Sequence, residues 1–159
     1  MLSFRKACLQ DIELYFHWAN DSSVREHSYN SKKINLKDHR KWFVSKLNDE
    51  KCNLYLFENN KKQAVGQVRI QKNKMFEAVI GISIDQHFRG RGFSKIMLKL
   101  STDSFLNTNP NFLLNAYIKE INLSSKYAFE NAGFKFSEII NYDGIKSFHY
   151  VKMFNASKK

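Results

Sequence analysis

The chain has 159 residues, the usual size of one domain, and its 43% hydrophobic and 14% aromatic residues suffice for a packed core. Lys and Arg number 26 against 15 Asp and Glu, and the resulting net charge of +11 favours anionic partners: nucleic acid, a membrane surface or a polyphosphate ligand. The basic residues are scattered, which argues against nucleic-acid binding, and no apolar run approaches the ~18 residues that span a bilayer. We therefore expect one cytoplasmic α/β domain over residues 1–159 that binds neither nucleic acid nor membrane.

The N-terminal third is predicted to contain one strand and two helices. Residues 4–8 are compatible with a strand, and Asp11 can cap a helix that runs to about residue 19. A polar loop carrying Arg25, Ser28 and Asn30 follows. Asn35 begins a second helix, with Asp38 three positions on in a weak capping-box arrangement.

The middle and C-terminal parts alternate between strands and helices. Residues 53–58, 64–71 and 76–85 are predicted to form an antiparallel meander, because short polar turns separate them. A glycine-containing loop leads into a helix whose apolar stripe is Ile96, Leu100 and Phe105. A strand over 113–118, a helix over 123–132 and a hairpin around Asp143-Gly144 complete the chain.

The segment from Arg89 to Lys95 is the most informative one chemically. A strand turns through two glycines directly into a helix, so unpaired N–H groups at the positive end of that helix can bind phosphate. Arg89, Arg91 and Lys95 add charge. Walker and dinucleotide loops fit worse, because GxxxxGK[ST] is absent and the third glycine of GxGxxG would be Lys95. The loop alone is equally compatible with a plain strand–helix turn.

Together with a second motif, this loop resembles the GCN5-related N-acetyltransferase (GNAT) family. The family's cofactor loop reads Gln/Arg-x-x-Gly-x-Gly/Ala, which the segment Arg89-Gly90-Arg91-Gly92-Phe93-Ser94 matches except at Ser94. The helix from Asn122 to Gly133-Phe134 resembles the family's following signature, and the element order is similar over essentially the whole chain. The resemblance implies a mixed, mostly antiparallel sheet of about seven strands flanked by about four helices. It also implies direct transfer of an acetyl group from acetyl-CoA to an amine.

The resemblance further implies which residues contact acetyl-CoA. The pyrophosphate would lie on the N–H groups of residues 89–95, and the pantetheine arm would pair with the backbone near Ile82 and Ile84 like an added strand. Asn122 and Ser125 would face the pantetheine or thioester end, although Asn122 is equally a helix N-cap. The expected cofactor-binding residues are Ile82, Ile84, Arg89, Gly90, Arg91, Gly92, Phe93, Ser94, Lys95, Asn122, Ser125 and Phe129, the last being either core or a wall of the thioester site.

Two departures from the family pattern leave the catalytic base and acid open. Many members have a tyrosine acid where this chain has Phe129, and Tyr127 lies roughly 200° around the helix from that position. The glutamate often found just before the strand's Ile-Gly is Val79 here. The weak candidates for a base are His39, Glu77, Asp85 and His87, or a water acting for one of them. His39 has the most suitable intrinsic pKa, with a surface or capping role as its alternative.

The N-terminal third is expected to form the acceptor side. The motifs Trp18-Ala19-Asn20-Asp21 and His39-x-x-Trp42-Phe43 resemble acetyltransferases that modify amino groups of nucleotide-activated sugars in bacterial glycan biosynthesis. The residues that would bind such a substrate are Asn20, Arg25, Ser28, Asn30, Gln67 and Arg69. The last two share a strand face, and arginine can hold phosphate bidentately; alternatively, the arginines only neutralise acidic neighbours.

The expected partner is therefore a small molecule, a nucleotide-linked amino sugar. Alternatives are a protein N-terminus, as for ribosomal-protein acetyltransferases, and a non-catalytic domain that only binds coenzyme A. Cys8 and Cys52 lie 44 positions apart without a CxxC pair or an adjacent His cluster, so no metal site is expected. The sequence is compatible with a monomer or a homodimer.

Overall fold

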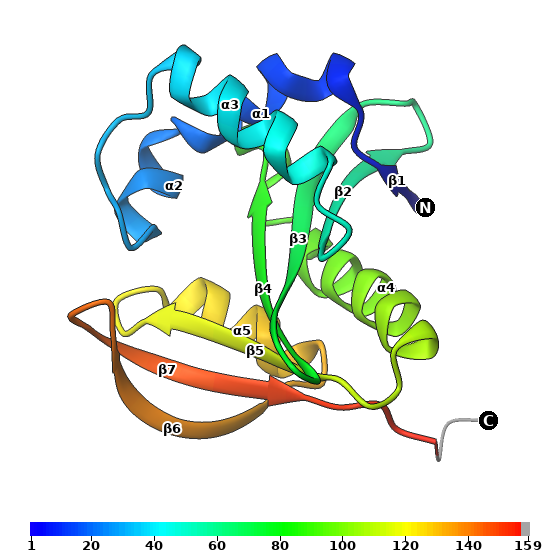
Figure 1. The fold of residues 1–159 in the computed structure, drawn as a ribbon, viewed down its shortest axis with the longest axis vertical. Helices are drawn as coiled ribbons and strands as arrows, with labels where there is room; N and C mark the ends of the chain where they lie inside the picture. The colour runs from blue at the N-terminus through cyan, green and yellow to red at the C-terminus, as the bar shows by residue number, and fades with distance from the viewer. Residues whose placement is uncertain (157–159) are drawn as a thin grey trace.

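The computed structural model describes residues 1–156 and has a seven-stranded sheet at its centre (Figure 1). The strand order is β1-β2-β3-β4-β5-β7-β6. All neighbouring strands are antiparallel except β4 and β5, which are parallel. The predicted mixed, mostly antiparallel sheet is thus confirmed, with strands β1 (Leu2–Lys6), β2 (Cys52–Asn59), β3 (Ala64–Lys74), β4 (Glu77–Ile84), β5 (Leu113–Lys119), β6 (Lys135–Tyr142) and β7 (Ile145–Lys152).

Helices cover both faces of the sheet, but unequally. One face packs against α4 and α5, while α1 and α3 lie over the β2 end of the other face (Figure 1). Two short 3-10 turns precede α1 and α4. The bounds are η1 (Leu9–Asp11), α1 (Ile12–Ala19), α2 (Ser22–His27), α3 (Leu36–Leu47), η2 (Gln86–Phe88), α4 (Phe93–Thr108) and α5 (Leu123–Asn131). No helix among the described residues is long and apolar enough to cross a membrane.

The prediction of a plain polar loop after residue 19 is wrong, because α2 lies within it. The Asp21 carboxylate accepts a hydrogen bond from the Val24 amide at 3.2 Å and so caps the helix. None of the six residues of α2 is buried, so the segment lacks the apolar period by which a helix is recognised. The described chain therefore has five α-helices rather than about four.

Two hydrophobic clusters hold the layers together. The larger lies between the sheet and α4 and α5, and the smaller joins α1 and α3 to β2 through Tyr15, Trp18, Phe43 and two strand leucines. The predicted stripe of α4 is partly wrong: Phe105 is buried, but Ile96 and Leu100 are exposed. The face of α4 toward the sheet instead carries Met97, Leu98, Ser101, Thr102, Phe105 and Leu106.

Away from β2, the second sheet face is contacted by the segment of α2 and Tyr29, through the Tyr29–Tyr142 ring pair and the bond from Lys119 to the Glu26 carbonyl. Directly opposed residues on neighbouring strands share a face of the sheet. The register therefore places Leu54 of β2, Arg69 of β3 and Gly81 of β4 side by side on this face. Tyr117 of β5 and His149 of β7 are a second such pair. Leu54 is buried under α1 and α3. The side chains from β4 to β7 on this face form the surface beside which the candidate site lies.

Candidate active site

β4 and β5 separate partway along their length, which opens one edge of β4. They pair only from Glu77–Leu113 to Val79–Asn115, and Figure 1 shows them diverging beyond that point. On the opposite edge the Asp85 amide donates to a carbonyl of β3, so strand alternation turns the backbone groups of Ile82 and Ile84 toward the open edge. An extended ligand can pair with such an edge as an added strand.

The loop after β4 ends at a helix N-terminus without a side-chain cap. Gly90 and Gly92 have φ angles of +73° and +75°, in the left-handed region that glycine adopts readily. Gly92 is the N-cap residue of α4 and offers no side chain, so the first N–H groups of the helix stay available to an anion. Residues 89–92 are exposed, and the loop is therefore accessible to a phosphate group.

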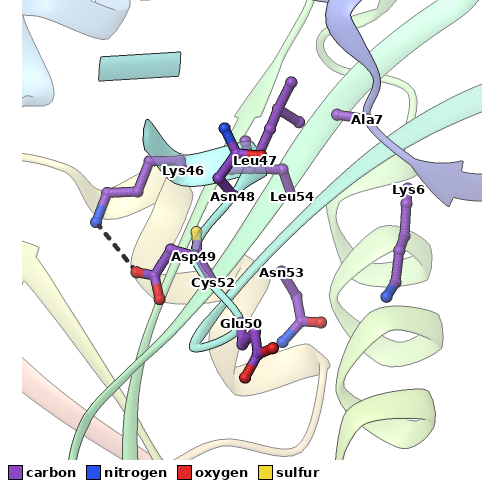
Figure 2. A pocket seen from close by; sticks show the side chains of 10 residues that line it. All are labelled: Lys6, Ala7, Lys46, Leu47, Asn48, Asp49, Glu50, Cys52, Asn53 and Leu54. Carbon is purple, nitrogen blue, oxygen red and sulfur yellow. Dashed lines mark ion pairs between the residues drawn. The ribbon is translucent and has the colours of Figure 1, made fainter. Parts of the chain in front are cut away.

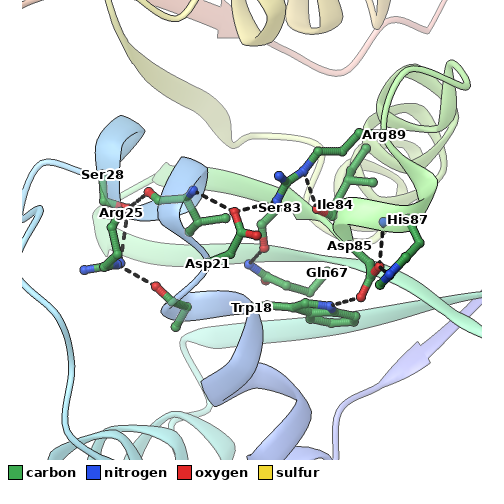
Figure 3. Close-up of polar contacts among 12 residues, drawn as sticks. Trp18, Asp21, Arg25, Ser28, Gln67, Ser83, Ile84, Asp85, His87 and Arg89 are labelled. Atoms are coloured by element: carbon green, nitrogen blue, oxygen red, sulfur yellow. Dashed lines mark hydrogen bonds and ion pairs between the residues drawn. The ribbon is translucent and has the colours of Figure 1, made fainter.

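Arg89 is bound to the protein itself. Its guanidinium pairs with the Asp21 carboxylate at 2.8 Å, and its Nε donates to the Ile84 carbonyl at 3.0 Å (Figure 3). Burial tends to raise the pKa of Asp21, but the bond from Arg89, the backbone amides of α2 and the Arg89 charge together outweigh it, and the pKa lies below its ordinary value. Arg89 thus ties the loop to α2 and occupies the Ile84 carbonyl, which leaves Ile82 as the better placed of the two expected backbone positions.

The α5 residues expected near the thioester have clear local roles. The Asn122 side chain accepts a hydrogen bond from the Ser125 amide at 3.2 Å, so its N-cap role is confirmed. Phe129 is 3% exposed and meets Phe134 edge-on at 4.9 Å. Of the two roles expected for Phe129, the structure supports the core, because the ring is packed inside the larger hydrophobic cluster.

The four polar residues of the expected acceptor loop shape the loop itself. Asn20 bonds to both backbone groups of Ile34 at 2.8 Å, and the Asn30 side chain accepts from the Lys32 amide. Arg25 donates to three backbone carbonyls and to the Ser28 hydroxyl; Figure 3 shows part of this network. Because four of the five guanidinium N–H groups are engaged, Arg25 cannot hold a phosphate bidentately.

Gln67 and Arg69 share the second sheet face, as strand alternation predicts. Gln67 donates to the Ser83 hydroxyl at 3.0 Å (Figure 3), and its Oε1 is buried with no partner among the described residues. The guanidinium carbon of Arg69 lies 5.6 Å from the centre of the Trp42 ring. A Cβ on neighbouring Gly81 would meet no atom within 4 Å. The strand face beside Arg69 is therefore open.

Three of the four candidate bases are engaged by other protein groups. His39 is 2% exposed, and its Nε2 lies 2.9 Å from a backbone carbonyl of α1, so it is a core residue rather than the surface or capping residue considered above. Asp85 accepts from Trp18 and from the amide and ring of His87, each at 2.9 Å (Figure 3). Burial tends to raise the pKa of Asp85, but these bonds bring it below its ordinary value. A carboxylate held in this way is a weak base.

Glu77 lies at the start of the β4–β5 pairing, two positions before its end, within a polar group that the sequence analysis missed. Asn115 is 2% exposed and donates to the Glu77 carboxylate at 3.2 Å. Its Oδ1 lies 2.7 Å from Nε2 of His149, whose ring stacks on Tyr117 at 4.8 Å. A signal was present, because Asn115 and Tyr117 alternate with apolar residues as on a strand with one polar face.

A separate hollow of about 240 Å³ lies between α3 and the first two strands (Figure 2). It is lined by Lys6, Ala7, Lys46, Leu47, Asn48, Asp49, Glu50, Cys52, Asn53 and Leu54. None of these is a residue expected to bind cofactor or acceptor. The hollow therefore does not belong to the site at the strand separation.

The comparisons with known proteins point to one family. The family model described as "Acetyltransferase (GNAT) domain" matches residues 1–135. No curated protein sequence matches the chain.

Solved structures share the fold at low sequence identity. A spermidine N-acetyltransferase from Vibrio cholerae, in complex with CoA and spermine, has a TM-score of 0.84 and 15% identity, covering 96% of this chain and 95% of that one. The aminoglycoside acetyltransferase AAC(6')-Ib in complex with coenzyme A has a TM-score of 0.82, 15% identity and the same coverage. A domain from Methanocaldococcus jannaschii DSM 2661 has a TM-score of 0.81 and 21% identity, covering 97% and 99%.

Proposed function

The chain belongs to the GNAT acetyltransferase family, and from that premise we propose that it acetylates the amino group of a nucleotide-linked amino sugar. Family membership makes the chain an N-acetyltransferase that uses acetyl-CoA. The identity of the acceptor is the proposal. The observation that carries it is the position of Arg69 on the second sheet face beside Gly81, next to the separated strands.

The residues present fit acetyl-CoA. The exposed glycine loop and the uncapped N-terminus of α4 suit a diphosphate, and the open edge of β4 at Ile82 suits an extended arm. When bound, acetyl-CoA supplies an acetyl group activated as a thioester. A backbone N–H of β4 would polarise the acetyl carbonyl. Phe129 has no hydroxyl, so it cannot protonate the departing sulfur.

The charge of the chain favours an anionic acceptor over a polycationic one. A net charge of +11 repels spermine and attracts a nucleotide diphosphate. Arg69 has a planar guanidinium suited to bidentate phosphate binding, and Trp42 beside it offers an aromatic surface. Arg69 and Trp42 would thus contact the nucleotide half of the acceptor, while the amine would lie toward the strand separation.

The test is an acceptor panel with release of the CoA thiol as the readout. The purified chain is mixed with acetyl-CoA and a nucleotide-linked 4-amino sugar, the same sugar without its nucleotide, spermine, kanamycin, or a peptide with a free N-terminus. We expect turnover on the nucleotide sugar to exceed that on the free sugar by at least about 100-fold in kcat/KM, the effect of two lost charge-assisted bonds. Faster turnover of spermine, kanamycin or the peptide would refute the proposed acceptor.

A pair of variants tests the role of Arg69. Arg69→Ala is expected to raise the KM for the nucleotide sugar about tenfold or more and to leave the Kd for CoA unchanged. Lys61→Ala removes one positive charge from the exposed turn between β2 and β3 and should change neither. Equal losses of acceptor and CoA binding in Arg69→Ala would indicate a purely structural Arg69.

A further inference from the structure

A chain of hydrogen bonds crosses three strands where β4 and β5 separate. It runs from the Glu77 carboxylate on β4 to the Asn115 amide on β5 at 3.2 Å, and on to Nε2 of His149 on β7 at 2.7 Å. Asn115 is 2% exposed and the His149 side chain 13% exposed. Stacking on Tyr117 at 4.8 Å fixes the plane of the His149 ring. The chain is therefore rigid and largely shielded from water.

The chemistry of the three groups fixes the direction of every bond. A carboxylate can only accept, so the NH₂ of Asn115 faces Glu77 and its carbonyl oxygen faces His149. Nε2 of His149 must then carry the hydrogen, and in the neutral ring Nδ1 is bare. Nδ1 is buried and without a hydrogen bond among the described residues, 3.7 Å from a Glu138 oxygen. His149 thereby keeps the donating end of the Asn115 amide turned toward Glu77.

The carboxylate so held lies on the strand face that runs along β4 toward the strand separation. Glu77 pairs with Leu113 two positions before the end of the β4–β5 pairing and shares its strand face with Val79 and Gly81. Its Oε2 accepts from Asn115, and the structure assigns Oε1 no hydrogen bond among the described residues. A base needs the ionised form and one accessible oxygen, and the Asn115 bond stabilises that form.

We propose that Glu77 accepts the proton of the acceptor ammonium, and that Asn115 and His149 are positioning residues that hold its carboxylate. The inference rests on the acetyl transfer of the proposed function but not on the identity of the acceptor. The ammonium loses one proton to Oε1, the N–C bond forms as the thioester C–S bond breaks, and the second nitrogen proton goes to the sulfur. The products are an amide, a free thiol and protonated Glu77, which returns its proton to water.

Other charged and titratable groups surround this carboxylate. Lys74 is opposite Glu77 in the β3–β4 pairing, and Glu138 of β6 lies beyond His149. Burial, then the neighbouring Tyr142 and Glu77, raise the pKa of Tyr117, so its phenol stays neutral. Glu77 and His149 are coupled through Asn115, so their roles have to be separated by substitution.

Variants that differ only in the donor at position 149 test the positioning role. His149→Gln keeps an N–H near the place of Nε2, whereas His149→Phe keeps the ring on Tyr117 and removes the donor. We expect Glu77→Gln to lower kcat at least about 100-fold and His149→Phe about tenfold, with the acid limb of the pH–rate profile moved to higher pH. His149→Gln should stay within about threefold of the wild type. Glu120→Gln, which removes an exposed carboxylate paired with Lys146, should change nothing.

The results separate this inference from the acceptor proposal. Kinetics use whichever amine the panel identifies, and the Kd for CoA must be unchanged in each variant. A Glu77→Gln enzyme within threefold of the wild type, or identical pH profiles for His149→Phe and His149→Gln, would overturn the inference. Nitrogen NMR of His149 needs no acceptor: we expect the Nε2–H form in the wild type, and an Nδ1–H form would overturn the positioning role even if no amine were acetylated.

Discussion

Substitution of Gly92 by alanine should weaken CoA binding without disturbing the packing of the protein. Gly92 has a φ of +75°, and a Cβ built there meets no protein atom within 4 Å. The added methyl group therefore causes no clash within the protein. Its effects are the backbone strain of an L residue in the left-handed region and the position of the Cβ at the helix N-terminus where the diphosphate would bind.

The strain costs about 1–2 kcal/mol. If the loop keeps its shape, this energy is lost from the stability of the fold, a fall in Tm of about 2–8 °C for a chain of this size. If the loop relaxes, the same energy is lost from ligand binding, an increase in Kd of about 5- to 30-fold. The Cβ at the anion site adds to the second effect, so we expect a Kd at least about fivefold above the wild type.

Calorimetric titration with CoA and thermal unfolding measure the two losses separately. Gly144→Ala is the matched control, because Gly144 has a φ of +78°, equally free surroundings and a place in the β6–β7 hairpin. It should lose stability to the same extent and keep the wild-type Kd. A Gly92→Ala protein whose Kd stays within twofold of the wild type would refute the assignment of the glycine loop as the diphosphate site.

Two further predictions concern the fold. Gly66→Ala should lower the free energy of unfolding, measured by chemical denaturation, by about 3 kcal/mol. The reason is that the added Cβ would overlap the Ser83 carbonyl oxygen and lie 2.9 Å from the Met97 methyl group. A loss below about 1 kcal/mol would contradict the close contact between β3 and β4. Asp11→Asn should cost about 1–2 kcal/mol at pH 7, because the hydrogen bonds from Arg5 lower the pKa of Asp11 against the opposing effect of burial. Because its pKa is lowered in the folded state, the Asp11 carboxylate stabilises the fold above its ordinary pKa of 3.8, and this stabilisation is lost as the pH falls through the folded pKa. The stabilities of the two proteins should therefore converge in acid. A constant stability difference down to pH 2 would contradict the Arg5–Asp11 pairing.

The local patterns of the sequence were sufficient for most of the fold. Alternating apolar residues, turn formers and helix caps act between neighbours in the chain, so the strands, the glycine loop and the Asn122 cap could be read directly. The six-residue helix α2 could not, because it buries no side chain. Its Asp21 cap is held by Arg89, a residue 68 positions away.

Side-chain roles that depend on how loops and helices fold around a residue were decided by the tertiary structure alone. Arg25 was a reasonable phosphate ligand by residue type, yet loop carbonyls occupy it. His39 had the right chemistry for a base, yet the packing of α1 against α3 buries it.

The sequence by itself determined the phosphate-type turn at residues 89–95, since glycine conformation and helix polarity are properties of a few consecutive residues. Only the folded sheet brought Glu77, Asn115 and His149 into one line. These three residues come from strands that are far apart in the chain and meet through β-pairing, and no pattern within a short window encodes which strand will lie beside which.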